Sequence, residues 1–235
     1  MSDNFFIISS WDWENELKPN WNRLFKTVKK FQIYHQGDIK NLSNAHIDTN
    51  LITKTKHTGS NISDYLLFIL KNYPYFPEYI GFIKANLIER HIPENKFISL
   101  AKKKDLVPLY FERKTLKKKS SLFRGFIFQQ IAPGICLEIT NNWYIKNTEK
   151  GKYFPLIEDL YYFITKQKII PKFIPMIPGA NFITKSEKIL RWDKSFFEKL
   201  YEAASYQSVP NPMPVEAWHI ERCLMYIFFF ERYNV

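Results

Sequence analysis

The apolar positions near the start of the chain follow the order expected for a strand, a helix and a second strand. Residues 5–9 form an apolar run that predicts a buried strand, and residues 31–34 predict another. Between them, apolar residues recur at helical spacing over residues 17–31, with Lys and Asn on the opposite side. A strand, a helix and a strand so close together in the chain favour a parallel βαβ unit.

A third predicted strand ends in a cluster of polar residues. Residues 79–83 form a short apolar run after Pro74 and Pro77, which is typical of a buried strand. The polar side chains that follow are Lys84, Asn86, Glu89, Arg90 and His91. Ligands of open α/β sheets bind beyond the carboxyl ends of the strands, so this cluster is a candidate anion site. The alternative is an ordinary solvated turn.

The rest of the chain continues the alternation. Five further segments carry the apolar spacing of a helix: residues 60–72, 97–101, 156–163, 186–204 and 216–231. Residues 135–139 are strand-like, and Pro171, Pro175 and Pro178 predict a loop that leads into residues 179–184. Without an internal repeat or a clear boundary, we expect a single α/β domain over residues 1–235. Its sheet should be mixed, mostly parallel and flanked by helices.

Composition adds an electrostatic expectation. Hydrophobic residues make up 46% of the 235 residues, which is ample for a core, and the net charge of +11 favours anionic partners. Residues 102–124 hold nine basic residues against two acidic ones, a local net charge of +7. We expect either a solvated loop here or a basic lip that attracts a phosphate-bearing substrate or an anionic membrane.

The cysteines and the longest apolar run bear on the compartment. Cys136 and Cys223 form no CxxC pair and have no His at metal-ligand spacing, so we expect buried thiols and no thiolate zinc site. The longest apolar run, residues 223–230, is too short to span a bilayer. No basic leader precedes the first apolar segment. We expect a cytoplasmic protein, with peripheral contact at an anionic membrane left open.

The last helical segment carries a carboxylate and an imidazole on one face. Glu216 and His219 are three residues apart, as are His219 and Arg222, whereas Glu221 points elsewhere. General-base catalysis uses such a carboxylate beside an imidazole, which makes Glu216 and His219 the catalytic candidates. The alternative is a capping carboxylate with a partner three residues on. P-loop, GxGxxG, GxSxG, HExxH and protein-kinase motifs are absent from the sequence.

Several short segments of the chain, taken together, resemble segments that occur together in one protein family. They are residues 79–91, Asn61-Ile-Ser-Asp-Tyr-Leu-Leu-Phe-Ile-Leu-Lys-Asn-Tyr73, Glu138-Ile-Thr-Asn-Asn-Trp-Tyr144, Pro178-Gly-Ala-Asn-Phe-Ile-Thr184 and Glu216-Ala-Trp-His-Ile-Glu-Arg222. Together they resemble an uncharacterised family related to glycosyltransferases of the GT-A type, over residues 60–230. Members often carry Gly-Arg-Glu where this chain has Ser63-Asp64, so no role is transferred to that Arg.

The resemblance implies a GT-A fold and the transfer of a sugar from a nucleotide-diphosphate donor to a glycan, lipid-linked glycan or other hydroxyl acceptor. Cations stabilise the leaving diphosphate in such a reaction, and we expect Arg90 and His91 to supply them. Asn86 and Asn181 would orient the sugar or phosphates. The other candidates for donor binding are Asp12, Asn142 and Arg222.

The expected reaction needs a base and a counter-charge for the diphosphate. Glu216 would take the acceptor's proton, and His219 would serve a phosphate or a metal. The Asp-x-Asp motif of many sugar-nucleotide transferases is absent, and Asp12-Trp13-Glu14, its nearest equivalent, suits a nucleotide pocket. We therefore expect a metal-independent mechanism, with a divalent cation (Mn or Mg) as the alternative.

Two other functions stay open at this point. The basic residues 102–124 would suit a protein that binds or processes nucleic acid, but they lack an interleaved aromatic ladder, so nucleic acid is not favoured. A catalytically inactive transferase fold that serves as an assembly partner is the third hypothesis.

Overall fold

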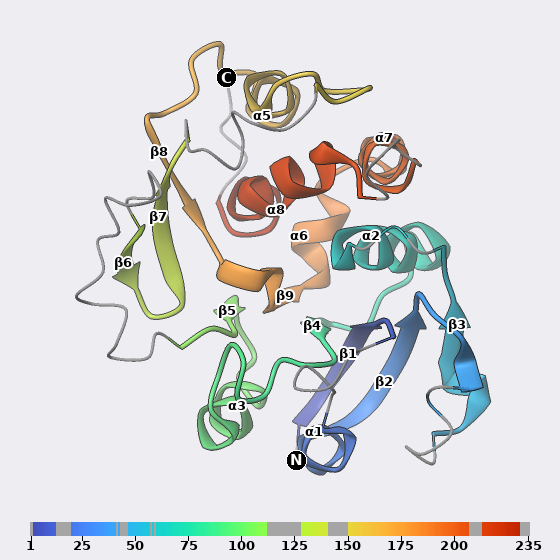
Figure 1. Cartoon of the computed structure of the whole chain (residues 1–235). Coiled ribbons are helices and arrows are strands. Elements are labelled where there is room, and N and C mark those ends of the chain that lie inside the picture. The colour runs from blue at the N-terminus through green and yellow to red at the C-terminus, as the bar shows by residue number, and fades with distance from the viewer. Residues whose placement is uncertain are drawn as a thin grey trace.

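The computed structural model describes residues 2–12, 20–40, 42, 47–56, 58, 60–111, 128–140, 150–206 and 213–230. A six-stranded sheet of order β3-β2-β1-β4-β9-β5 lies at its centre (Figure 1). Its strands are β1 (Ser2–Ser10), β2 (Val28–His35), β3 (Ile52–Lys54), β4 (Tyr79–Lys84), β5 (Val107–Pro108) and β9 (Phe182–Lys185). Strands β1 to β4 run parallel, and β9 is antiparallel to both β4 and β5. The predicted α/β class with a mixed, mostly parallel sheet is confirmed.

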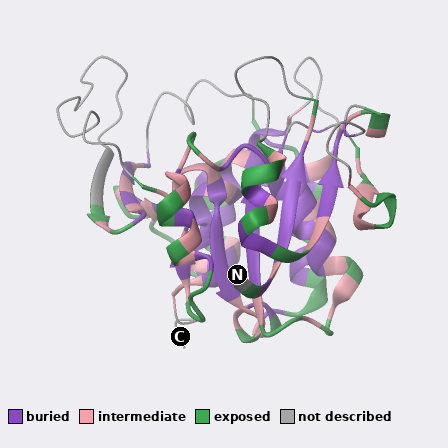
Figure 2. Cartoon of the chain, turned by 90° about the horizontal axis from the view of Figure 1, so that it is seen from below, coloured by how far each residue is buried: buried purple, intermediate pink, exposed green. Residues whose placement is uncertain are grey.

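Both faces of this sheet are buried, which explains why its strands are continuous apolar runs in the sequence. Successive side chains of a strand point to opposite faces. In β1, Phe6 and Ile8 join one hydrophobic cluster, and Ile7 joins another on the far side. Figure 2 shows the strands buried between layers whose outer surfaces are exposed.

Helices cover the two faces unequally. The first cluster packs against α1 (Trp21–Thr27) and α3 (Glu94–Leu100). The larger cluster lies under the remaining helices: α2 (Asn61–Asn72), α5 (Ile157–Thr165), α6 (Ser186–Leu190), α7 (Lys194–Ser205) and α8 (Val215–Phe228). Two short 3-10 helices, η3 (Thr49–Leu51) and η6 (Pro178–Ala180), precede β3 and β9. Helix α8 thus belongs to the thicker layer, over the strands whose carboxyl ends are considered below.

A second, three-stranded antiparallel sheet has the order β6-β7-β8 and lies beside α8 (Figure 1). It consists of β6 (Phe128–Ala132), β7 (Ile135–Ile139) and β8 (Phe173–Met176). The prolines around residue 175 predict a loop, and that prediction is wrong for β8. Pro175 pairs with Leu137, which an edge strand permits because its outer side needs no amide donor.

Two predicted helices have different bounds in the structure. The helix predicted over residues 17–31 ends at Thr27, because Val28 already pairs with Ser2 in the ladder between β1 and β2. The segment 186–204 forms two helices rather than one. Residues 191–193 separate them, and the indole Nε1 of Trp192 donates a 2.9 Å hydrogen bond to the carbonyl of Ile227 on α8.

Candidate functional site

The order of the strands places a crevice between the carboxyl ends of β1 and β4. The chain runs outward from β1 through β2 to β3, and then returns to the other side of β1 as β4. Ligands of open α/β sheets bind at such a reversal, outside the carboxyl ends of the strands. In this chain those ends are Ser9 and Ser10 on β1 and Lys84 on β4.

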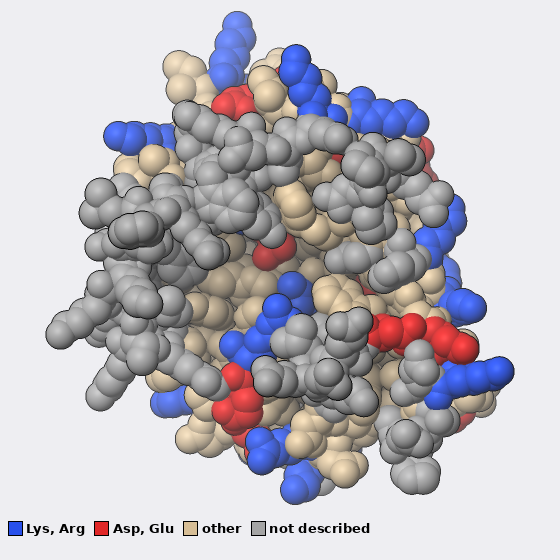
Figure 3. Space-filling model, viewed as in Figure 1, with Lys and Arg blue, Asp and Glu red and all other residues tan. Residues whose placement is uncertain are grey.

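Lys84 lies at the centre of a group of charged side chains from two distant parts of the chain. Burial lowers the pKa of the Lys84 ammonium; Glu221 raises it, while Arg90 and Arg222 lower it. The four charges are therefore within electrostatic reach of one another. The face seen in Figure 3 is hollowed near its centre, where basic and acidic side chains lie next to each other. Arg222 is paired with Glu138, so Lys84 and Arg90 are the cations of this group that can hold an anion, with Glu221 as the neighbouring carboxylate.

The turn after β4 presents two polar side chains toward the interior. Asn86 is buried, and neither atom of its amide has a hydrogen-bond partner among the described residues. The Nε2 atom of His91 is likewise buried without a partner there. Burial, followed by Lys84 and Arg90, lowers the pKa of His91 to about 3. His91 is therefore neutral at pH 7, and it can offer a ligand an N–H or a lone pair but no charge.

Asn181, a predicted sugar or phosphate ligand, is occupied by the backbone. Its Oδ1 accepts a 2.7 Å hydrogen bond from the amide of Lys84, and its Nδ2 donates to the carbonyl of Gly179 at 3.1 Å. Gly179 has φ +78, and a Cβ atom there would lie 2.6 Å from the imidazole of His91. Asn181 therefore positions Lys84 and the His91 turn, rather than offering its amide to a ligand.

Asp12 lies just beyond β1, as its place in the sequence predicts. Its Oδ1 is 3.4 Å from Nε2 of the buried His35, and its Oδ2 accepts a 3.3 Å hydrogen bond from the amide of Asp38. The Asp12 carboxylate lies close against Gly37, where a Cβ atom would be 2.3 Å from Oδ1. Asp12 thus ties the loops after β1 and β2 together at the crevice, and its side chain is still 49% exposed.

Beneath the crevice lies a buried carboxyl to which the sequence analysis gave no role. Asp64 in the first turn of α2 accepts hydrogen bonds from Ser9 Oγ at 2.6 Å and from Gln36 Nε2 at 2.8 Å. Burial raises the pKa of Asp64 to about 7, although Ser9 and Gln36 lower it. The group joins β1, β2 and α2 at their common edge. A polar residue inside an otherwise apolar helix was the available signal.

Glu216 does not have the environment of a general base. It is fully buried, and its two oxygens accept hydrogen bonds from the amide of Tyr153 at 2.9 Å and from the Tyr206 hydroxyl at 2.8 Å. These contacts tie the start of α8 to the segment before α5 and to the end of α7. The geometry therefore argues for a structural carboxylate, and Glu216 is not brought next to Lys84 by any described contact.

His219 and Arg222 lie deeper in the molecule than a surface site would require. Neither ring nitrogen of His219 has a partner among the described residues, and burial lowers its pKa to about 4, with Arg222 contributing. The Nε atom of Arg222 is 3.1 Å from Oε2 of Glu138 on β7. Burial raises the pKa of Glu138, and the charge of Arg222 opposes that shift. Arg222 therefore links α8 to the second sheet through a buried ion pair.

Two members of the charged group around β4, Lys84 and Glu221, received no role in the sequence analysis. Lys84 was counted in the polar cluster without a role, and Glu221 was placed on a different helix face from Glu216 and His219. Both are half-buried in the structure and feel one another's charge. Helical spacing could have identified Glu221 only with the knowledge of which face of α8 meets β4, and that depends on packing.

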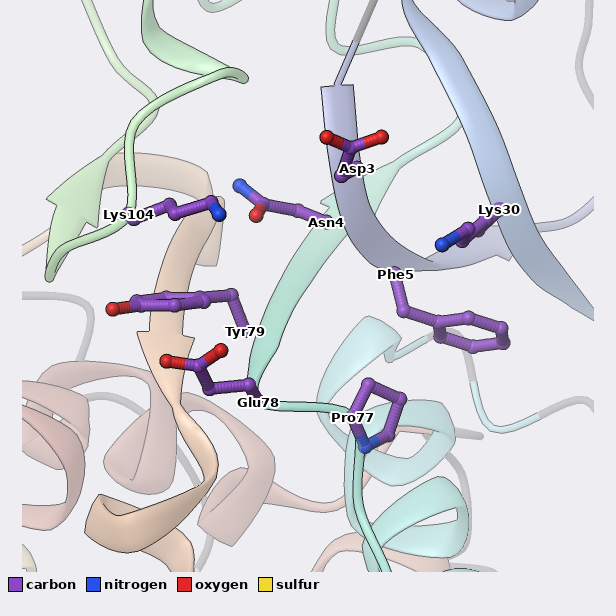
Figure 4. A pocket seen from close by; sticks show the side chains of 8 residues that line it. All are labelled: Asp3, Asn4, Phe5, Lys30, Pro77, Glu78, Tyr79 and Lys104. Atoms are coloured by element: carbon purple, nitrogen blue, oxygen red, sulfur yellow. The ribbon is translucent and has the colours of Figure 1, made fainter.

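A second cavity, of about 390 Å³, opens at the amino ends of the same strands. Figure 4 shows that its lining comes from the starts of β1 and β4, from β2 and from the chain after α3: Asp3, Asn4, Phe5, Lys30, Pro77, Glu78, Tyr79 and Lys104. Its four charged side chains are exposed. Asn4 is buried and donates hydrogen bonds to the carbonyls of Ala101 and Lys103, both at 2.9 Å.

The remaining predicted features are tested only in part. Asn142 and residues 112–124 of the basic segment lie outside the described residues. Over the described part of the chain, no three His, Cys, Asp or Glu side chains are grouped to hold a metal ion. Cys136 and Cys223 are buried and unbonded to each other. None of the described helices is long and apolar enough to cross a membrane.

Comparisons with known proteins identify no relative whose function could be compared with this site. No protein-family profile, no curated protein and no solved structure matches this chain. The resemblance to the GT-A related family therefore stays a prediction.

Proposed function

We propose that the protein transfers a sugar from a nucleotide-diphosphate donor to a hydroxyl acceptor. The observation that carries this proposal is the position of Lys84. It lies at the carboxyl end of β4, next to the point where the strand order reverses. The charges of Glu221 and Arg90 act on its ammonium group. A diphosphate that leaves a sugar gains negative charge in the transition state, and preorganised cations stabilise that charge. Lys84 and Arg90 would supply these cations from the protein itself.

The proposed chemistry is a single displacement at the anomeric carbon of the sugar. A bond forms from the acceptor oxygen to this carbon, the bond from the carbon to the diphosphate oxygen breaks, and the acceptor's proton passes to a carboxylate. Glu221 replaces Glu216 as our candidate for that carboxylate, because it is half-buried and its charge acts on Lys84, whereas Glu216 is held by Tyr153 and Tyr206. A base must reach the proton that it removes.

The donor's remaining contacts follow from the same crevice. The unpartnered amide of Asn86 and the neutral imidazole of His91 are suited to hydroxyl or phosphate oxygens, since buried polar groups generally require a partner. Asp12, at the crevice mouth, would accept from the sugar or base of the nucleotide. The counter-charge comes from Lys and Arg, so we propose turnover without a divalent cation.

Ligand-induced stabilisation tests the site and its ligand class together. A nucleoside diphosphate that binds the folded protein at 100 times its Kd should add about 2.7 kcal/mol of stability, a rise of several degrees in Tm. We expect one class of nucleoside diphosphate to give this rise and adenosine or inorganic sulfate to give none. Equal melting temperatures with every nucleoside diphosphate would refute the proposal and favour the inactive assembly partner.

Turnover of the matching sugar nucleotide tests the base. Glu221→Gln should lower kcat by about 100-fold while the nucleotide-induced Tm shift survives, because general-base catalysis supplies about that factor. Glu202→Gln, an exposed change of the same kind on α7, is the matched control. Activity that disappears entirely in a chelator would contradict the metal-independent mechanism.

A further inference from the structure

The turn between α5 and β8 presents an exposed apolar side chain among lysines. Its sequence is Lys166-Gln-Lys-Ile-Ile-Pro-Lys172, which contains three cations and no acidic residue. Ile169 in the middle is 84% exposed. An isoleucine left in water contributes nothing to the stability of the folded chain, because the hydrophobic effect scales with the apolar area that is buried. We call residues 166–172 the basic turn.

The exposure of Ile169 is enforced by contacts on both sides of it. At the end of the turn, Thr140 donates its backbone amide to the carbonyl of Lys172 at 3.0 Å and its hydroxyl to the carbonyl of Pro171. At its start, the Tyr161 hydroxyl donates to Oε1 of Gln167 at 2.8 Å. The neighbouring Ile170 packs against the main core cluster. The turn is therefore anchored with one isoleucine inside and the next one outside.

Further cations and an aromatic side chain extend this surface. Lys166 and Lys199 of α7 both lie over the ring of Phe163, with their Nζ atoms 5.2 and 5.1 Å from its centroid. Tyr162, one helical turn before Lys166, is 49% exposed. Figure 3 shows basic side chains projecting from the edge of the molecule at which Figure 1 places α5. The acidic residues of α5, Glu158 and Asp159, lie at its other end.

Local roles account for only part of this arrangement. The ammonium of Lys166 donates to the carbonyl of Phe163 at 3.0 Å, which is a common way to cap a helix end. No comparable contact is described for Lys168 or for Ile169 among the described residues. An apolar side chain held out between lysines combines the two attractions that hold proteins at an anionic bilayer, namely apolar burial and phosphate contact.

We propose that the basic turn docks on an anionic lipid surface. Ile169 and the ring of Tyr162 enter the headgroup region, and Lys166, Lys168 and Lys172 contact lipid phosphates while their aliphatic stems lie along the apolar layer. The proposal concerns a different surface from the crevice at β4, so it stands or falls separately from the proposed transfer reaction. It also differs from the expectation that residues 102–124 form the membrane-attracting segment.

Sedimentation with vesicles distinguishes the basic turn from general charge attraction. The full chain should bind vesicles of phosphatidylcholine with phosphatidylglycerol, bind pure phosphatidylcholine weakly, and release as salt rises. The triple variant Lys166→Gln, Lys168→Gln, Lys172→Gln should lower the partition coefficient at least about tenfold, since each lysine near such a surface contributes several-fold. The matched triple variant at Lys102, Lys103 and Lys104 removes the same charge and should change binding less than about twofold. Equal losses in the two triple variants would overturn the proposal.

A polarity-sensitive dye at position 169 tests insertion directly. Both native cysteines are buried, so Ile169→Cys supplies a single accessible thiol for labelling, and Tyr75→Cys, at a position that is 85% exposed, supplies the control. The dye at 169 should shift to the blue on addition of anionic vesicles, and the dye at 75 should not. If the true partner is an acidic protein or a nucleic acid, the dye at 169 should show no blue shift when anionic vesicles are added. That result would refute docking on a lipid surface.

Discussion

The two ends of the six-stranded sheet treat their buried polar groups in opposite ways. At the amino end, Asn4 is buried and both its amide hydrogens are used by the carbonyls of Ala101 and Lys103. At the carboxyl end, Asn86 is equally buried, and its amide has no partner among the described residues. The same side chain is thus a structural tie at one end and an unsatisfied group at the other.

The charged side chains at the two ends of the sheet differ in their exposure to water. The cavity at the amino end is lined by exposed Asp3, Lys30, Glu78 and Lys104, which water can solvate (Figure 4). At the carboxyl end, Asp64 is fully buried and Lys84 is half-buried, and burial shifts the pKa of each toward its neutral form. Folded proteins rarely keep such costs without a use, and they concentrate them at functional sites. A cavity is therefore the weaker indication of function in this molecule.

The largest contrast should appear between two lysines at opposite ends. Lys84→Met removes a cation from the proposed diphosphate site, and we expect kcat/KM for the sugar nucleotide to fall about 100-fold or more. Stability should be unchanged or higher, because a buried charge is replaced by an apolar chain. Lys104→Met at the amino end should leave turnover and stability as they are. Comparable losses of turnover from the two variants would erase the distinction between the ends.

A second contrast concerns the pH dependence of folding. The pKa of Asp64 in the folded protein is about 7, above the ordinary value of 3.8, so folding favours the protonated carboxyl. The stability that this carboxyl contributes is therefore full below pH 3.8 and is lost as the pH rises through 7. Asp64→Asn should remove this decline, worth on the order of a few kcal/mol between pH 5 and 8. Urea titrations at several pH values measure it.

The exposed Asp3 at the amino end is the matched position for that experiment. Asp3→Asn makes the same chemical change at an exposed position and is the control variant in the same urea titrations. A pH slope that is the same in the Asp64→Asn variant and the unaltered chain would show that the buried carboxyl is not the source.

The smallest contrast is between the two asparagines. Asn4→Leu leaves the carbonyls of Ala101 and Lys103 without their donor and should destabilise the fold by about 2 kcal/mol. Asn86→Leu removes an unsatisfied buried amide and should be neutral or stabilising by about 1 kcal/mol. Chemical denaturation curves give both values. Destabilisation of equal size at both sites would mean that Asn86 is a structural tie as well.

The strands of the large sheet were predictable because both of their faces are buried. Continuous apolar runs mark β1, β2 and β4, and the polar residues after β4 mark its carboxyl end. The edge strand β8 was not predictable, because Pro175 reads as a loop until a partner strand is known. The end of α1 was also missed, since the apolar spacing continues smoothly from Thr27 into a strand.

The site could be anticipated in part for a similar reason. Local sequence shows that Lys84, Asn86, Arg90 and His91 follow one strand. It does not show which helix face meets that strand, so the side chain of α8 that reaches the field of Lys84, Glu221, received no role. The two hydrogen bonds that hold Glu216 come from Tyr153 and Tyr206, and only the tertiary arrangement reveals them.

The ion pair between Arg222 and Glu138 links the ionisation of a buried carboxyl to the position of Arg222. Glu138 is buried, and Arg222 is the charge that favours its ionised form. A phosphate that drew Arg222 toward itself would leave this carboxylate uncompensated, and the carboxylate would then acquire a hydrogen ion from the medium. The heat of nucleotide binding would in that case vary with the ionisation enthalpy of the buffer.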